Sequence, residues 1–320
     1  MNVLGIETSC DETSASIVKD GRKVISNVIS SSEQFHKKYG GIIPEIAFRM
    51  QLEAITGVVN CAVEEAGITT KGIGLISVTE NPGLIGSLLT GMSFAQAISF
   101  GLGTPMVKVN HLYSHIYAAF LEERIPRFPL IALVVSGGHT SLFYLKDFNT
   151  ITLLGSTHDD ACGEAFDKVA KILGLGYPGG PVIEQMSKKG NPHSVKFGCS
   201  KTKNEFDFSF SGIKTAVLYF LQKNSRLQAL QPALRADICA SFQETAINTL
   251  IEKTLLACKI KKIRNFIVAG GVAANNRLRE KFFRAAEENN LKCFFPAQRL
   301  CTDNAAMVAG LGFQVFKKGR

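Results

Sequence analysis

Two histidines at helical spacing are the residues of this 320-residue sequence that point most directly to chemistry. His111 and His115 lie four positions apart behind Asn110, a suitable N-cap, so both imidazoles project from one face of the expected helix. That spacing lets both rings reach one metal ion. The alternative is that they only cap and line a helix. No glutamate follows His111, which excludes the HExxH pattern of metalloproteases and its built-in general base.

Two histidines do not complete a metal site, and the third ligand that best suits them is a carboxylate from another element. Asp303 is the candidate. It stands directly before a helix expected over residues 304–316, where it could equally serve as an ordinary N-cap. Both roles are compatible with one carboxylate.

Three turns that carry a pair of glycines could bind an anion. They are residues 136–140, 177–181 and 270–275. Unpaired backbone N–H groups at such turns and at helix N-termini favour phosphate, because the helix dipole also attracts negative charge. Each pair is also an ordinary turn sequence, so a nucleotide-like ligand and a purely structural role both stay open.

The elements that must position these residues alternate between strands and helices. Strands over 3–6, 15–18 and 23–29 form an opening meander, and strands over 130–135 and 141–145 repeat its hairpin. The remaining expected elements are strands at 75–78, 106–109 and 265–269 and helices at 45–66, 84–100, 165–173, 212–223, 234–257, 275–288 and 304–316. This pattern predicts an α/β fold with mainly parallel strand pairing and two related lobes, 1–125 joined by the C-terminal helix 304–320, and 126–303.

The composition excludes several classes of protein. With 46% hydrophobic residues and 29 glycines, the chain is neither disordered nor of low complexity. No run of eighteen uninterrupted apolar residues occurs, since Gly86, Ser87 and Thr90 already interrupt the stretch 84–100, and no basic region precedes an apolar run at the start. We therefore expect a cytoplasmic protein that does not span a membrane. The eight cysteines form no CxxC pair, which excludes a zinc ribbon.

Four motifs taken together resemble the TsaD family, the tRNA threonylcarbamoyladenosine transferases formerly called O-sialoglycoprotein endopeptidases. The motifs are Gly5–Thr13, Asn110–His115, Val135–Thr140 and Gly270–Asn275. The resemblance covers essentially the whole chain. It implies a fold like that of actin, sugar kinases and heat-shock ATPases, in which two lobes with duplicated RNase H-like α/β cores flank a nucleotide cleft.

The resemblance also implies a reaction. The threonylcarbamoyl group of threonylcarbamoyl-AMP passes to the exocyclic amine of the adenosine next to the anticodon, in tRNAs that read codons beginning with A, and AMP is released. It implies a TsaB-type paralogue and a TsaE-type ATPase as partners. The alternatives are an ATP-dependent kinase or ATPase of the same superfamily, and a tRNA-binding protein without catalysis.

The resemblance assigns roles to individual residues. The metal ligands fall on His111, His115 and Asp303, for one divalent ion, Fe²⁺ or Zn²⁺. The contacts to the adenylate fall on Val134, Val135, Ser136, Gly137, Gly138, Asp167, Gly180 and Asn275, with Glu184 beside the ribose. Asp11 or Glu12 could be the general base, although polar turn residues are commonly structural.

Basic stretches are candidates for contact with tRNA, since the formal net charge is +9. They are Lys37, Lys38, Lys188, Lys189, Lys201, Lys203 and the run 259–264. The alternative for each is a solvated face.

Two positions depart from the sequence usual in bacterial relatives. Phe48 and Gln51 stand where those relatives have Ser and His, and we expect local differences there. Val134 stands where archaeal and eukaryotic relatives tend to have Tyr, which favours a bacterial-type protein.

Overall fold

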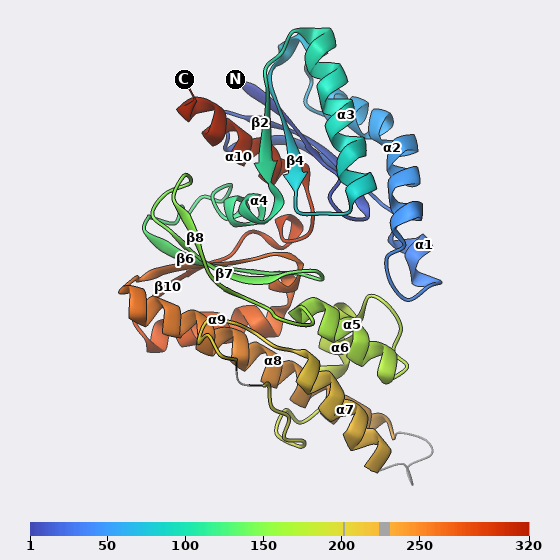
Figure 1. Ribbon diagram of the computed structural model, residues 1–320, viewed down its shortest axis with the longest axis vertical. Coiled ribbons are helices and arrows are strands. Elements are labelled where there is room, and N and C mark those ends of the chain that lie inside the picture. Colours follow the sequence, from blue (N-terminus) through green and yellow to red (C-terminus); the bar gives the residue numbers. More distant parts are fainter. Residues whose placement is uncertain (201, 224–230, 320) are drawn as a thin grey trace. The chain divides into compact units, whose positions relative to one another are not determined.

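The computed structural model describes residues 1–200, 202–223 and 231–319, and the chain divides into two compact units (Figure 1). Unit 1 comprises Met1–Ile125 and Pro296–Arg320, and unit 2 comprises Pro126–Phe295. The sequence analysis assigned residues 296–303 to the second lobe. The structure places them in unit 1, because the Ala297 amide donates to Glu122 Oε1 at 2.9 Å and Leu300 and Cys301 are buried.

Unit 1 is built on a five-stranded sheet with the order β3-β2-β1-β4-β5. Its strands are β1 (Asn2–Glu7), β2 (Glu12–Lys19), β3 (Lys23–Ser31), β4 (Ile73–Asn81) and β5 (Met106–Asn110). Its helices are α1 (Glu33–Lys37), α2 (Pro44–Glu65), η1 (Thr70–Gly72), α3 (Ile85–Leu102), α4 (His111–Ala118), η3 (Gln298–Leu300) and α10 (Ala305–Lys318).

Unit 2 contains a second five-stranded sheet with the order β10-β9-β6-β7-β8. Its strands are β6 (Leu130–Val135), β7 (Thr140–Leu145), β8 (Ile151–Ser156), β9 (Asn265–Ala269) and β10 (Lys292–Phe294). Its helices are α5 (Cys162–Ile172), α6 (Gly179–Ser187), α7 (Ser211–Lys223), α8 (Pro232–Lys261), η2 (Gly271–Ala274) and α9 (Asn276–Glu288).

The two sheets repeat one topology. In each, a three-stranded antiparallel meander is followed by two strands that add in parallel beside its first strand. The predicted duplicated α/β fold is therefore confirmed. The prediction of mainly parallel pairing is wrong, because within the described ranges four strand pairs are parallel and four are antiparallel.

Strand β1 lies at the centre of unit 1 and is covered on both faces. Alternate side chains of a strand point to opposite faces. Leu4 and Ile6 join the apolar core formed with α2, whereas Gly5 faces α10. A Cβ atom at Gly5 would collide with the backbone of Ala305 and Ala309, so glycine is required for this close approach. The helix that follows residue 303 is thereby fixed against the strand that ends at Glu7.

Helices α2 and α3 are long and apolar enough to cross a membrane, with mean hydropathies of 1.2 and 1.3. Length and composition alone are weak evidence, because helices that cover a sheet meet the same criteria. Here α2 packs on β2 and β3, and α3 packs on β4. Both helices nevertheless leave large apolar side chains exposed, among them Leu52, Ile85 and Leu89.

Candidate metal centre and adenylate pocket

The histidine pair lies on α4, a short helix that begins directly after β5. The Asn110 side chain accepts hydrogen bonds from the Leu112 and Tyr113 amides at 2.9 and 3.2 Å, which confirms the predicted N-cap. His111 and His115 are both buried. Their ring centroids lie 4.6 Å apart with the planes at 77°. The i, i+4 spacing thus brings both imidazoles to one face, as the sequence predicts.

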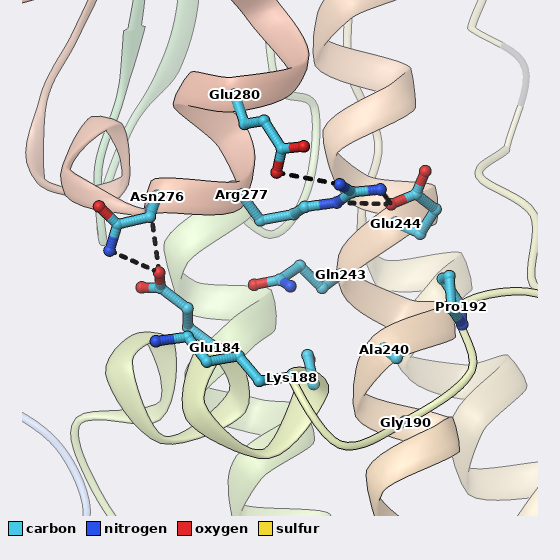
Figure 2. A pocket seen from close by; sticks show the side chains of 11 residues that line it. Glu184, Lys188, Gly190, Pro192, Ala240, Gln243, Glu244, Asn276, Arg277 and Glu280 are labelled. Atoms are coloured by element: carbon cyan, nitrogen blue, oxygen red, sulfur yellow. Dashed lines mark hydrogen bonds and ion pairs between the residues drawn. The ribbon is translucent and has the colours of Figure 1, made fainter.

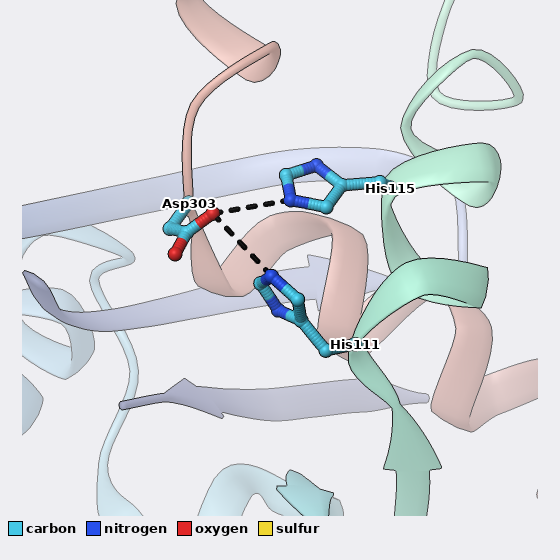
Figure 3. Close-up of side chains that lie close together, drawn as sticks. All are labelled: His111, His115 and Asp303. Atoms are coloured by element: carbon cyan, nitrogen blue, oxygen red, sulfur yellow. Dashed lines mark hydrogen bonds and ion pairs between the residues drawn. The ribbon is translucent and has the colours of Figure 1, made fainter. Parts of the chain in front are cut away.

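Asp303 meets this pair from the segment before α10 (Figure 3). Its Oδ1 atom lies 3.1 Å from His115 Nε2 and 3.6 Å from His111 Nε2. The N-cap of α10 is Asn304, whose side chain accepts from the Met307 amide at 3.1 Å. The interpretation of Asp303 as the N-cap is therefore wrong, and its carboxylate is directed at the histidines instead.

A buried carboxylate, Glu7, orients His111 by contacting Nδ1, the ring nitrogen on the side away from Asp303. This residue is not among those predicted from the sequence. Glu7 is fully buried at the end of β1, and its Oε2 lies 3.1 Å from His111 Nδ1. Thr79 donates to the same oxygen at 2.6 Å, and the Ser9 amide donates to Oε1 at 2.6 Å. The only sequence signal for this role is a glutamate that ends an otherwise apolar strand.

The charges in this cluster shift the protonation of its members. Burial disfavours the charged form of His111, but Asp303 and Glu7 outweigh it and raise the pKa of His111 to about 9. Burial likewise opposes ionisation of Glu7, but His111 outweighs it and holds the pKa of Glu7 below its ordinary value. The carboxylates of Asp303 and Glu7 therefore place negative charge beside the imidazole nitrogens of His111.

The donor set fits a divalent metal. Ligand atoms of His111, His115 and Asp303 all lie within 4.8 Å of one another. When Glu7 accepts the Nδ1 proton of His111 and a metal displaces the Nε2 proton, the Nε2 lone pair is directed to the side where Asp303 lies, which is the arrangement that metal-bound histidines have. Two imidazoles and one carboxylate suit iron and zinc. No further protein ligand is needed for a site that keeps positions open for substrate.

The loop between β1 and β2 forms another wall of this centre. Ser9 Oγ lies 3.1 Å from His111 Nδ1. Burial, then the carboxylates of Asp303 and Asp11, raise the pKa of Glu12 well above its ordinary value. The carboxyl of Glu12, one of the two candidate bases, thus interacts electrostatically with Asp303 and with Asp11, the other candidate base.

In unit 2, two of the glycine turns lie side by side at the carboxyl ends of β6 and β9. Gly270 has φ 94°, and a Cβ atom there would collide with the Val135 carbonyl group. Val134 and Val135 are fully buried in β6, so neither residue is open to a ligand in this structure. By contrast, Gly137 and Gly138 are exposed, and a Cβ at either would meet no atom within 4 Å.

The start of α5 supports the first of these turns. The Gly163 amide donates to the Ser136 carbonyl at 3.1 Å, and a Cβ at Gly163 would collide with that carbonyl. Farther along α5, the Asp167 carboxylate accepts from the Gly179 amide at 2.7 Å. Burial raises the pKa of Asp167 above its ordinary value, although this hydrogen bond opposes the shift. Helix α5 thus joins the turn at Ser136 to the N-terminus of α6.

A pocket of about 330 Å³ lies between α6, α8 and α9 of unit 2 (Figure 2). Glu184 lines it and accepts from the backbone and side-chain nitrogens of Asn276, each at 2.9 Å. Arg277 also lines it, and Glu244 and Glu280 hold its guanidinium at 3.3 and 3.0 Å. The volume is in the range of small-ligand sites, and the lining is polar enough to fix a ligand's orientation.

Of the predicted adenylate residues, Glu184 lines this pocket, whereas Gly180 and Asn275 are not among its lining residues but lie next to them in α6 and before α9. Gly180 lies one turn before Glu184 in α6. Asn275 caps α9 through the Leu278 amide and donates to Gln243, which lines the pocket, at 2.8 Å. Both polar atoms of the Asn275 side chain are thereby engaged within the protein. The sequence analysis missed Gln243 and Arg277, since nothing in the sequence links α8 with α9.

The basic candidates are dispersed. The run 259–264 precedes β9, whereas the glycine turn at Gly270 follows it, so the length of the strand, roughly 15 Å, separates them. Lys188 lines the pocket and Lys203 is exposed. Lys201 lies outside the described residues.

Solved structures share the duplicated α/β fold. A full-length HypF is similar with a TM-score of 0.63 at 13% identity, over 99% of this chain and 46% of that chain. Component A of (R)-2-hydroxyglutaryl-CoA dehydratase from Acidaminococcus fermentans is similar with a TM-score of 0.55 at 14% identity, over the full length of both chains. At such low identity these likenesses show the fold alone. The class is a duplicated α/β fold in which two units repeat one sheet topology.

The chain belongs to the TsaD family, tRNA N6-adenosine threonylcarbamoyltransferase, whose model matches residues 23–310. A relative with that name from Symbiobacterium thermophilum is 49% identical over 99% of this chain and 92% of its own length. Another from Syntrophus aciditrophicus is 48% identical over 100% of this chain and 94% of its own length. The chain is accordingly a transferase of tRNA modification, which favours that hypothesis over the kinase alternative.

Proposed function

We propose that this chain transfers the threonylcarbamoyl group of threonylcarbamoyl-AMP to the exocyclic amine of the adenosine adjacent to the anticodon, in tRNAs that read codons beginning with A. The observation that carries the proposal is the cluster of two buried histidines, His111 and His115, with the partly exposed Asp303 in a chain of this family. Because that cluster suits a divalent ion, we propose one Fe²⁺ or Zn²⁺ per chain. Two histidines with one carboxylate favour iron.

The reaction itself is an acyl transfer. A bond forms between the adenosine amine and the carbonyl carbon, and the bond from that carbon to the phosphate oxygen of AMP breaks. The amine loses a proton, and AMP leaves as the anion. Since the acyl group is already activated as an adenylate, the protein has to position the reactants, stabilise the oxyanion and accept one proton.

The residues of unit 1 supply the acid–base and electrostatic part. A metal held by His111, His115 and Asp303 would polarise a carbonyl or bind carboxylate oxygens. Glu7 would keep His111 in the tautomer that presents Nε2 to this site. Asp11 or Glu12 would accept the proton, and burial together with the carboxylates of Asp303 and Asp11 raises the pKa of Glu12 above its ordinary value.

The residues of unit 2 would hold the AMP portion. The exposed backbone at Gly137 and Gly138 would accept the phosphate, because no side chain obstructs its approach. The pocket lined by Glu184 and Arg277 would hold the nucleoside, with Asp167 and Gly180 at the base of α6. Asn275 would act indirectly, by capping α9 and holding Gln243.

We further propose that the chain works with a TsaB-type paralogue and a TsaE-type ATPase in the cytoplasm. The family resemblance supplies these partners. The exposed apolar side chains of α2 and α3, Leu52, Ile85 and Leu89, offer a surface for one of them. The basic side chains would attract the tRNA backbone.

A reconstituted assay tests the function. Purified chain, both partner proteins, ATP, threonine, bicarbonate, an enzyme that forms the adenylate, and an unmodified tRNA transcript are incubated, and the tRNA nucleosides are analysed by mass spectrometry. We expect threonylcarbamoyladenosine at the position next to the anticodon. Absence of the product with every component active would reject the transferase proposal, and full multiple-turnover activity of the chain without partners would reject only the proposed assembly.

Replacing Gly137 by valine should weaken adenylate binding without unfolding the protein. A Cβ there meets no protein atom within 4 Å, so the side chain would occupy only the space proposed for the phosphate. Calorimetry with AMP should show affinity at least about tenfold below that of the wild type, since the phosphate would lose its backbone contacts. Unchanged affinity in a folded variant would mean that the turn is only structural.

A further inference from the structure

We infer that Gln51 is a positioning residue for the transfer reaction, because it holds the loop of residues 8–12 that carries Asp11 and Glu12 beside the metal cluster. The inference rests on the proposed function. Gln51 is one of the two residues that depart from the pattern implied by the family resemblance, in which a histidine is expected at this position. It lies on the inner face of α2 and is 1% exposed.

The side-chain amide of Gln51 contacts three carbonyl groups of one loop. Its Nε2 lies 3.0 Å from the Glu12 carbonyl oxygen, 3.1 Å from that of Cys10 and 3.4 Å from that of Thr8. Chemistry fixes the orientation of this amide, because the flipped form would direct an oxygen at three other oxygens. One side chain of α2 therefore gathers the alternate carbonyls of the loop around a single donor.

The two polar atoms of the Gln51 side chain differ in their contacts. Gln51 Oε1 is buried and has no hydrogen-bond partner among the described residues. A buried acceptor without a partner is unfavourable. The amide nitrogen of Gln51 thus donates to the loop, while its oxygen accepts no hydrogen bond from the described residues.

The remaining carbonyls of the loop are held from other elements. Ser32 Oγ donates to the Asp11 carbonyl at 2.7 Å and lies 3.0 Å from Nε2 of the buried His36. The Leu84 amide, just before α3, donates to the Ser9 carbonyl at 2.8 Å. Ser32 and Leu84 each donate to one carbonyl of the loop, whereas Gln51 contacts three.

Phe48, the second departure from the family pattern, contacts α3, another helix that holds this loop. Phe48, one turn before Gln51, packs against Gly86 at the start of α3, where a Cβ atom would collide with its ring. The first turn of α3 also contacts the loop, because Ser87 Oγ donates to the Cys10 carbonyl at 3.2 Å. Phe48 and Gln51 therefore both act on the loop of residues 8–12, one through α3 and the other directly.

A glutamine can do here what a histidine cannot. A primary amide has two N–H donors on one atom, whereas a neutral imidazole has a single N–H, on one or the other of its two nitrogens. Only the amide can supply two hydrogens to carbonyls that converge on one point. We expect this chain to hold the loop more tightly than a variant that carries the histidine of its relatives.

Gln51→Met and Gln51→His test this inference in the complete assembly. The methionine variant keeps the side-chain length but removes every donor. We expect its kcat to fall roughly ten- to hundredfold with the KM for tRNA within about twofold, because the loop would misplace catalytic groups without touching the tRNA surface. The histidine variant should recover part of the kcat. Gln222→Met, an exposed position on α7, is the matched control and should leave both constants unchanged.

Hydrogen exchange supplies a measurement that does not depend on activity. In Gln51→Met, amides of residues 8–12 should exchange faster while the rest of unit 1 keeps its protection. Faster exchange throughout unit 1 with a lower Tm would overturn the inference in favour of a general stabilising role. Unchanged kcat and unchanged exchange in both variants would also overturn it. If the wild type fails to modify tRNA, the proposed function is wrong, and the exchange data still decide whether Gln51 holds the loop.

Discussion

Replacing His111 and His115 together by alanine is expected to remove the bound metal and to slow threonylcarbamoyl transfer by more than about a hundredfold. Both Nε2 atoms face the Asp303 carboxylate, so the double variant leaves one protein ligand, which cannot retain a divalent ion. Elemental analysis of the purified chain should give about one metal per chain for the wild type and almost none for the variant.

The control is His193→Ala, an exposed histidine of unit 2, which should keep the full metal content. Circular dichroism and Tm show whether the double variant is folded, and Asp303→Asn, which changes a partly exposed carboxylate, provides a second test of the same site. Equal metal content in the wild type and in both site variants would eliminate the cluster as the metal centre.

The Glu7→Gln substitution should weaken metal binding by roughly ten- to a hundredfold, the usual effect of removing a carboxylate behind a metal-bound histidine. The change keeps the shape of the side chain, but it removes the negative charge that favours the Nδ1 proton of His111. Without that charge, the imidazole can take the other tautomer, which places a proton where the metal would bind. Competition with a chelating dye on the apo chain measures the affinity.

Glu65→Gln, at the exposed end of α2, is the matched substitution and should leave the metal affinity unchanged. Because Glu7 also holds Thr79 and the Ser9 amide, Glu7→Asp is made in parallel to separate the loss of charge from the loss of these contacts. Wild-type affinity in a folded Glu7→Gln variant would contradict the proposed role.

The sequence predicts those parts of the fold whose signal is local. The hairpin at 130–145 repeats the hairpin at 3–18, and this is enough to predict a duplicated fold. The prediction of mainly parallel pairing goes wrong because alternation of strands and helices does not reveal the third strand of a meander, and β8 was not predicted at all. Helix α6 begins at Gly179, inside a segment predicted as a turn, since Gly-Gly-Pro is a strong turn signal.

The residues of the candidate site likewise divide into those with a local sequence signal and those without one. His111 and His115 are predictable because four residues of helix bring them together. Glu7 is not, because its partner His111 follows 104 residues later and only the packing of β1 beside β4 and α4 joins them. Gln51 can be recognised in the sequence only as a departure from a family pattern. Its three hydrogen bonds depend on the path of a loop that no periodicity encodes.

Asp303 and α10 belong to unit 1 but follow unit 2 in the chain, which sets an order for biosynthesis. A ribosome has to translate residues 126–295 before β1 can receive α10 at Gly5 and before the histidines can receive their carboxylate. Unit 2 has its own sheet and can fold as it leaves the ribosome, whereas unit 1 can complete its fold only after α10 has been translated. A product of premature termination before Asp303 therefore lacks one of the three proposed metal ligands, so it should bind less metal than the full-length chain.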